Sequence, residues 1–262
     1  MKKISALFLA LIALCFADLA LAASAVATSA TGTVQFQTGT GPARPLRAGD
    51  EVRQGDTVFT GANSSVVLKF DDGQVAALTS NSRMVITAYQ YSPASESGNI
   101  FLSLIGGGMR TITGLIGRKT PSQVAYRAAT ATIGIRGTDC VVATDGGSVV
   151  VTVSEGICTY QLPGKEVVEI PAGQAVLIRP DGTVFRGTIA QVLGQLSPGL
   201  AGIVNGTNGL NSQVQGANPG VPRQGQDGQG QDGQQGGQGG QGSQGQQGQQ
   251  GGGGGGGGAS RQ

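Results

Sequence analysis

The chain has 262 residues, with 17 basic and 15 acidic side chains, a formal net charge of +2, and no histidine or tryptophan. A near-neutral chain without a basic run excludes an electrostatic nucleic-acid-binding surface. The absence of histidine removes the usual general base, the usual activator of a nucleophile and the commonest zinc ligand. The aspartates lie mostly in Asp-Gly or Gly-Asp pairs, which are typical of turns. We therefore predict no catalytic residue, no metal site and no cofactor, and we expect a protein that is not an enzyme.

The N-terminus has the pattern of a secretory signal peptide at 1–22. Lys2 and Lys3 precede an apolar stretch from Ile4 to Leu14, which is short for a membrane span, and Ala20-Leu21-Ala22 fits a cleavage site. No other stretch is apolar and long enough to cross a bilayer. We expect export to the periplasm or to the cell surface of a bacterium, and a linker at 23–31.

Short strands separated by turn signals follow over residues 32–187. Their alternating apolar residues predict an all-β domain of many short strands, arranged as a sandwich, a roll or a solenoid. Gly106-Gly107-Gly108 is expected to end one strand, and Ser154-Glu155-Gly156 is expected to be a turn of a meander.

The stretch Thr130–Asp139 is the most informative part of the predicted domain. Its apolar residues alternate until Gly134 and Gly137 bracket Arg136, and Thr138 follows. Glycine inside a strand marks a bulge, a bend or a close backbone approach. Arg136 could present its guanidinium to a carboxylate of a partner, or it could bond backbone carbonyls at a bend; the second interpretation is the simpler one.

Two cysteines remain after the expected cleavage, Cys140 and Cys158. An exported chain with two cysteines favours a disulfide. In a simple meander, however, the two residues would flank a central strand and lie about 9–10 Å apart, beyond disulfide reach. Both alternatives stay open: a disulfide, or two buried thiols that act as small apolar groups.

The C-terminal part divides into a helix with a linker, 188–215, and a tail, 216–262. Ile189, Val192, Leu193 and Leu196 have helical spacing, and Pro198-Gly199 is expected to stop the helix. The helix could cover the β domain as a lid or remain a frayed linker. The Gly/Gln-rich tail has almost nothing to bury, so we expect it to be disordered, either simply solvated or capable of self-association.

An ordered set of short motifs resembles the FecR domain family. The set is Gly49-Asp50, Gly55-Asp56, Thr60-Gly61, Asp72-Gly73, Gly107 to Thr111, Thr113 to Gly117, Tyr126-Arg127, Thr130 to Asp139, Glu155-Gly156 and Ala172-Gly173-Gln174. The resemblance covers about residues 32–180 and implies an exported β domain that serves interaction or sensing. The family's best-known members are membrane-spanning regulators of iron uptake with a cytoplasmic segment that acts on a sigma factor. This chain shows the pattern of a stand-alone exported domain, so the iron role is not carried over.

The leading hypothesis is an exported, non-enzymatic binding or scaffold protein that acts through protein contacts, with a role in envelope signalling. The alternative is a structural or cell-surface matrix component that assembles through its tail. The expected partner is an envelope protein or a surface polymer, not nucleic acid. Arg136, Arg110, Arg118 and Lys119 are the candidate partner contacts, and a solvated surface explains the last three equally well.

Overall fold

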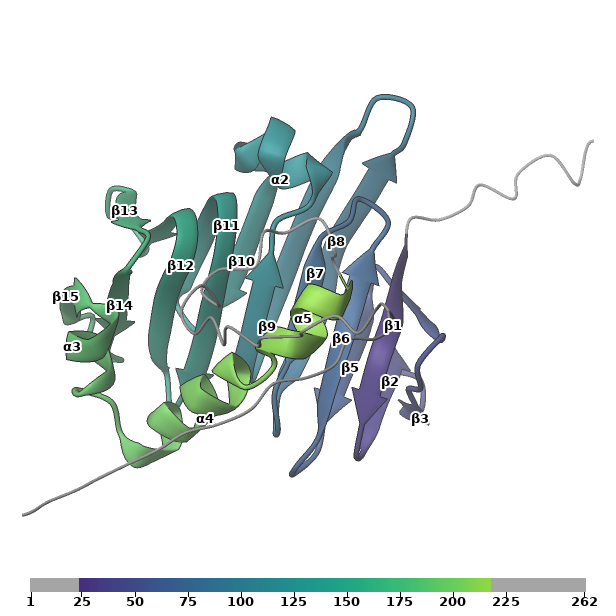
Figure 1. Cartoon of the computed structure of the whole chain (residues 1–262), viewed down its shortest axis with the longest axis horizontal. Helices are drawn as coiled ribbons and strands as arrows, with labels where there is room; N and C mark the ends of the chain where they lie inside the picture. The colour runs from purple at the N-terminus through teal and green to yellow at the C-terminus, as the bar shows by residue number, and fades with distance from the viewer. Residues whose placement is uncertain (1–23, 218–262) are drawn as a thin grey trace, which may run out of the picture. The chain divides into compact units, whose positions relative to one another are not determined.

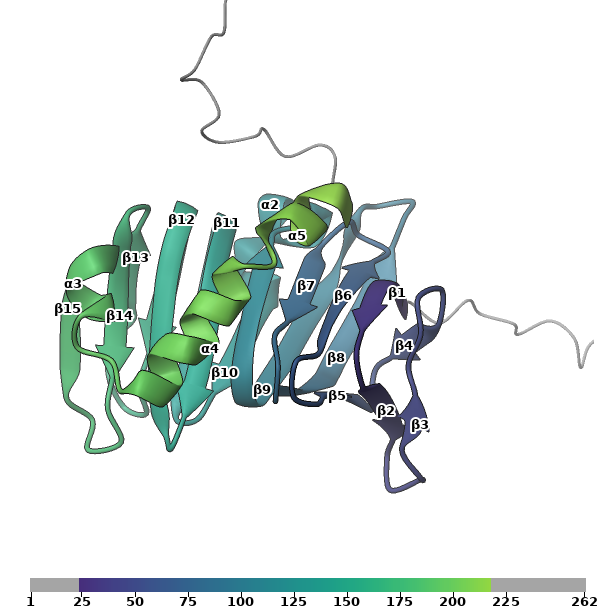
Figure 2. The same cartoon turned by 60° about the horizontal axis from the view of Figure 1, so that its bottom comes forward.

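The computed structural model describes residues 24–217. Their strands belong to one continuous 15-stranded sheet, which folds over into two facing layers (Figures 1 and 2). The all-β prediction is confirmed. Of the sandwich, roll and solenoid that the sequence left open, the domain is a two-layer sandwich.

One layer is named the covered layer, because the C-terminal helices pack on its outer face. Across the sheet it contains β4 (Glu51–Arg53), β1 (Ser24–Thr31), β6 (Ser65–Phe70), β7 (Val75–Leu78), the second half of β9 (Ser97–Ile112), the second half of β11 (Ala131–Asp145), the first half of β12 (Ser148–Gln161), β14 (Gln174–Ile178) and β15 (Val184–Thr188).

The opposite layer is named the open layer. It contains β3 (Arg44–Pro45), β2 (Val34–Thr38), β5 (Asp56–Thr60), β8 (Arg83–Ser92), the first half of β9, β10 (Val124–Ala128), the first half of β11, the second half of β12 and β13 (Val168–Pro171). Strands β9 and β10 pair in parallel, and the short α2 (Leu115–Lys119) and the 3₁₀ turn η1 (Pro121–Gln123) connect them.

The three long strands β9, β11 and β12 run through both layers. Each changes layer near a glycine in the left-handed region: Gly107 (φ 85°), Gly137 (φ 61°) and Gly156 (φ 74°). The β11–β12 ladder shifts its register at this place, as a bulge does. The predicted strand end at Gly106–Gly108 and the predicted turn at Ser154–Gly156 were therefore wrong. These glycines bend continuous strands, and a local glycine signal does not distinguish a bend from a turn.

The main core lies between the two layers. Phe70 of β6 packs edge-to-face on Tyr89 of β8, with ring centroids 5.0 Å apart. The Tyr126 hydroxyl of β10 donates to the side-chain oxygen of Gln74, just before β7, at 3.2 Å. These contacts join residues of facing layers, so the burial that stabilises the fold depends on the change of layer by the long strands.

Three helices follow the last strand: α3 (Ile189–Leu193), α4 (Pro198–Asn208) and α5 (Asn211–Ala217). Helices α4 and α5 run diagonally across the covered layer (Figure 2). Val204 of α4 packs with Val150 and Leu177, and Val214 of α5 packs with Val67 and Val75. The helical segment is therefore a cover on the sheet, as the lid interpretation proposed.

The helical segment differs from its prediction in detail. Pro198 does not stop a helix; it begins α4, because the first helical position needs no backbone N–H. The Ser197 hydroxyl accepts a hydrogen bond from the Leu200 N–H at 3.2 Å and caps this helix. Helical structure continues to Ala217, two residues past the predicted boundary.

The predicted linker at 23–31 needs correction, because Ser24–Thr31 is strand β1, paired with β6 and β4. The side chains of Ala25 and Ala27 face the core. Small Ala, Ser and Thr residues give a weak hydrophobic alternation, which is why the strand was missed. The predicted signal peptide, and the predicted tail beyond Ala217, lie outside the described residues.

Candidate functional site

The outer faces of the two layers differ. Helices α4 and α5 cover the outer face of the covered layer, through contacts with β9, β11, β6 and β7. Among residues 24–217, no helix packs on the strands of the open layer in the same way (Figure 2). The outer face of the open layer, named the open face, is therefore the sheet surface that this part of the chain leaves accessible.

Three arginines stand on the open face. Arg83 of β8, Arg127 of β10 and Arg136 of β11 are exposed, and each is next in sequence to a buried core residue. Because successive side chains of a strand point to opposite faces, these arginines point away from the core. In the structure described here, none of the three guanidinium groups forms an ion pair or a hydrogen bond.

The strands of the open layer contain two carboxylates. Asp56 is buried and accepts hydrogen bonds from the Thr38 hydroxyl at 2.5 Å and from the Arg53 N–H at 2.8 Å. Glu169 lies on the edge strand β13, opposite Thr159. Glu155 lies at the corner, directly before Gly156 and opposite Asp139, so Arg136 has a carboxylate on the neighbouring strand. Arg83 and Arg127 stand on the open face without an ion-pair partner among residues 24–217.

Two of the arginines lie over aromatic rings. The guanidinium carbon of Arg83 is 5.2 Å from the ring centre of Phe59 on β5, and that of Arg127 is 5.6 Å from the ring centre of Phe101 on β9. Each such contact contributes about 0.5–1 kcal/mol at an exposed site and limits the mobility of the side chain. A planar guanidinium held on a ring is prepared for a bidentate bond with a carboxylate.

A cavity of about 480 Å³ opens beside Arg127. Its wall includes Thr130 and Thr132 of the β10–β11 hairpin, and Gln161 and Leu162 at the end of β12. The same hollow is therefore lined by one cation and by hydroxyl groups that can donate hydrogen bonds, while the Gln161 side-chain nitrogen already donates to the Lys165 carbonyl at 3.1 Å.

Arg136 stands at the corner where β11 changes layer. At Gly134, before it, a β-carbon would lie 2.5 Å from the Thr159 hydroxyl, so a larger residue there requires the Thr159 side chain to turn away. Thr138, after it, donates its N–H to the Thr113 hydroxyl at 2.8 Å and ties the corner to the end of β9. Among the described residues the Arg136 guanidinium makes no hydrogen bond to a backbone carbonyl, and its side chain is exposed.

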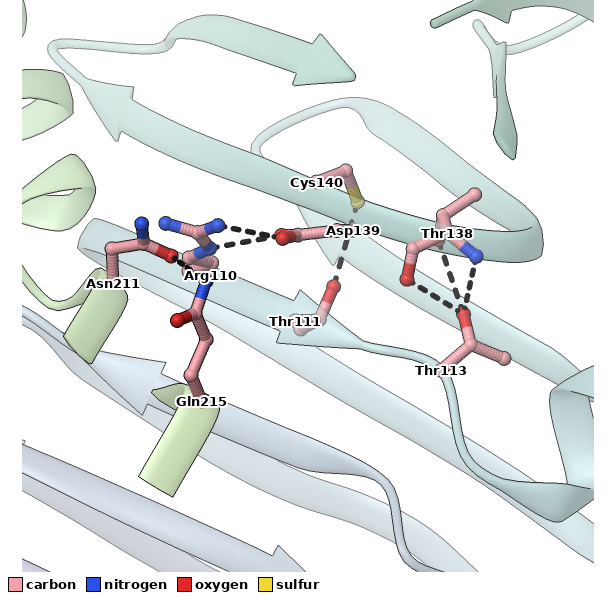
Figure 3. A network of polar contacts seen from close by, with 8 residues as sticks. All are labelled: Arg110, Thr111, Thr113, Thr138, Asp139, Cys140, Asn211 and Gln215. Carbon is pink, nitrogen blue, oxygen red and sulfur yellow. Dashed lines mark hydrogen bonds and ion pairs between the residues drawn. The ribbon is translucent and has the colours of Figure 1, made fainter. Parts of the chain in front are cut away.

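Arg110 is not a surface residue, contrary to the expectation that it contacts a partner. Its Nε and Nη2 donate to the two carboxylate oxygens of Asp139 at 2.8 and 2.6 Å, and both residues are 8% exposed. Figure 3 shows this bidentate pair with Asn211 and Gln215 of α5 next to the guanidinium. Because Arg110 is buried, it is no longer a candidate partner contact. Its guanidinium lies beside α5 instead.

Arg118 and Lys119 are exposed on α2, and Lys119 forms an ion pair with Glu96. Asp72 holds this helix: its carboxylate accepts a hydrogen bond from the Ile116 N–H at 3.3 Å, and its carbonyl accepts one from Leu115. Burial raises the pKa of Asp72 above its ordinary value. Arg118 lines a second cavity, of about 260 Å³, beside Asp71 and Asp72, so its charge has carboxylates close by.

Sequence reasoning missed Arg83, Phe59, Phe101 and Asp139. The signal for the first three was the period-2 alternation of the predicted strands, which places them opposite to core residues. Asp139 gave no such signal, because its partner lies 29 residues away on another strand.

Within residues 24–217 no group of three or more His, Cys, Asp or Glu side chains could hold a metal ion. No helix of this region is long and apolar enough to span a membrane.

Comparison with known proteins bears on the same β domain. Residues 56–158 match the model of the family described as FecR protein, which confirms the resemblance for this segment. A search of curated proteins finds no match. Two crystal structures of a proposed anti-sigma factor from Parabacteroides distasonis ATCC 8503, at 2.50 and 1.65 Å resolution, are similar at 14% sequence identity, with TM-scores of 0.41 and 0.40. Each alignment covers 50% of this chain and 59% of the other, so less than two thirds of that protein is matched.

Proposed function

We propose that this chain is an exported, non-enzymatic binding protein, and that its open face docks an acidic segment of a protein partner in envelope signalling. The observation that carries the proposal is the group of three unpaired arginines on the open face. The match of residues 56–158 to the FecR family supports a role in protein contacts. The signal pattern of the first 22 residues supports export.

The chemistry of the open face suits a protein carboxylate. Arginine and aromatic residues are enriched among the side chains that dominate protein interfaces. Arg83 and Arg127 are already ordered by their rings, so less rotamer entropy is lost when a partner binds. Ser103, Ala125 and Gly134 are small residues on the same face of β9, β10 and β11, and they would let a partner approach the sheet closely.

The test compares two triple variants of the full chain in cells. In the face variant, Arg83→Ser, Arg127→Ser and Arg136→Ser remove the charge of the open face. In the control variant, Arg44→Ser, Arg47→Ser and Arg53→Ser remove three exposed arginines near the edge strands β3 and β4. The control has the same change of net charge. It also loses one arginine–aromatic contact, that of Arg44 with Phe36, and the exposed ion pair of Arg53 with Glu51.

We expect partner capture by in-cell cross-linking to be retained by the control variant and lost by the face variant. Removing interface arginines costs about 1–2 kcal/mol each, which is roughly a tenfold loss of affinity per residue. The captured protein, identified by mass spectrometry, should bind the purified chain with an affinity that falls as salt rises.

Equal capture by the face variant and the unchanged chain would overturn the proposal. So would capture of an anionic polysaccharide in place of a protein. Capture that is lost only when residues 218–262 are deleted would instead favour the second hypothesis, assembly through the tail. The mass of the mature N-terminus tests export directly: we expect Ala23 as the first residue.

A further inference from the structure

Cys140 and Cys158 lie on directly paired strands. Cys140 is in the covered half of β11, opposite Val153, and Cys158 is in the open half of β12, opposite Ile135. The interpretation that a separate strand stands between them was wrong, because residues 148–161 form one continuous strand. The strand pair nevertheless places the two cysteines on different sides of the corner.

The corner brings the two side chains into the same part of the core, where a hydrogen bond joins the two thiols. Between the cysteines, β11 bends at Gly137 and β12 bends at Gly156, and the hairpin folds from one layer into the other. On a flat hairpin, residues this far apart along the strands would be separated by well over 10 Å. On the inside of a bend they converge. Both side chains are fully buried in the core between the layers, and in the structure both are free thiols.

We propose that Cys140 and Cys158 form a disulfide bond in the exported chain. The bond would join the two layers on the inside of the corner whose outside carries Arg136. It would also restrain the hairpin that contributes strands to both layers. Its formation in the cell depends on the proposed export, because oxidising compartments are where structural disulfides persist.

The surroundings of the sulfur atoms support this pairing. The Thr111 hydroxyl lies 3.4 Å from Cys140 Sγ (Figure 3). A hydrogen bond from the Cys158 thiol lowers the pKa of Cys140 and, together with burial, raises the pKa of Cys158. Both shifts depend on the two thiols being in contact in the folded core.

The reaction requires a disulfide oxidant, such as oxidised glutathione or the disulfide of a thiol–disulfide oxidoreductase. The thiolate of one of the two cysteines attacks one sulfur of that disulfide, and the other sulfur leaves as a thiolate. The second cysteine then loses its proton, attacks the sulfur of the first and releases the second oxidant sulfur. Two electrons and two protons pass to the oxidant. Because neither cysteine is exposed in the folded domain, this exchange takes place before the core closes.

The first experiment refolds the full chain, with the double variant Cys140→Ala/Cys158→Ala as control, in oxidised and reduced glutathione. The products are denatured and labelled with N-ethylmaleimide. We expect a peptide that links Cys140 to Cys158 and no label on either residue unless a reductant is added first. In thermal unfolding, a reductant should lower the midpoint of the refolded wild-type chain by about 5–15 °C and leave the control unchanged.

Label on both cysteines of the oxidatively refolded chain would overturn the proposal, and so would a linked peptide without any effect of the reductant on the midpoint. The same labelling of protein taken from the cell tests export separately. Free thiols in the cell together with a disulfide after refolding would contradict the exported location and leave the pairing correct. The variants with arginine replacements test the open face independently of both results.

Discussion

Replacing Gly156 by alanine is expected to lower the free energy of unfolding by more than about 4 kcal/mol, or to prevent folding altogether. A β-carbon at this position would lie 2.1 Å from the carbonyl oxygen and 2.8 Å from the carbonyl carbon of Gly137. Both are backbone atoms, so no side chain can turn away to relieve the contact. The positive φ of 74° adds about 1–2 kcal/mol for any residue with a β-carbon. The measurement is urea unfolding of the purified variant, with its soluble yield beside that of the unchanged chain.

Gly173→Ala is the matched control for this prediction. Its φ of 79° is nearly the same, but no atom lies within 4 Å of the β-carbon that would be added. It should therefore lose only the conformational cost, about 1–2 kcal/mol. If the two variants are equally stable, the close approach of the Gly137 carbonyl is not what excludes a β-carbon at position 156.

Replacing Asp139 by alanine should destabilise the domain by about 3–5 kcal/mol. The change leaves the Arg110 guanidinium buried between the sheet and α5 without its bidentate partner. An uncompensated buried charge is costly, whereas the intact pair contributes little beyond what an apolar pair would. The double variant Arg110→Met/Asp139→Leu should consequently recover most of the loss. Urea unfolding of the three proteins measures these differences, and a double variant no more stable than Asp139→Ala would contradict the explanation.

Glu51→Ala provides the comparison with an exposed ion pair. Arg53 and Glu51 form a salt bridge at 2.8 Å, but their side chains are 59% and 50% exposed. Exposed pairs contribute about 0–1 kcal/mol, so this variant should unfold close to the unchanged chain. A loss as large as that of Asp139→Ala would show that burial of the charge is not the cause.

The strands of the β domain could be predicted from the sequence because alternation of apolar residues is a local property. Val66, Leu68 and Phe70 recur at every second position of β6, and all three are in the core. The same reasoning failed for β1, whose Ala25 and Ala27 bury too little surface to stand out. It also divided β9 and β12 at their glycines, because a glycine that bends a strand has the same neighbours as one that ends it.

The candidate site could be predicted only in part. The stretch Gly134-Ile135-Arg136-Gly137 identified Arg136, but the pairing of β9, β10 and β11 decided that Arg127 lies on the same face. Arg110 looked equivalent to them in the sequence. Its burial depends on α5, which is about a hundred residues further along the chain, so no local pattern could report it.

The sequence by itself determined the all-β class, most strand positions and the resemblance to the FecR family, because side-chain period and turn chemistry act between near neighbours. Tertiary structure alone decided that the long strands change layer, that Cys140 and Cys158 converge, and which arginines remain free. These outcomes depend on contacts between residues far apart in the chain. The free energy that stabilises these contacts comes from excluding water between the two layers. The sequence of a single strand does not specify which strands will face it across the core.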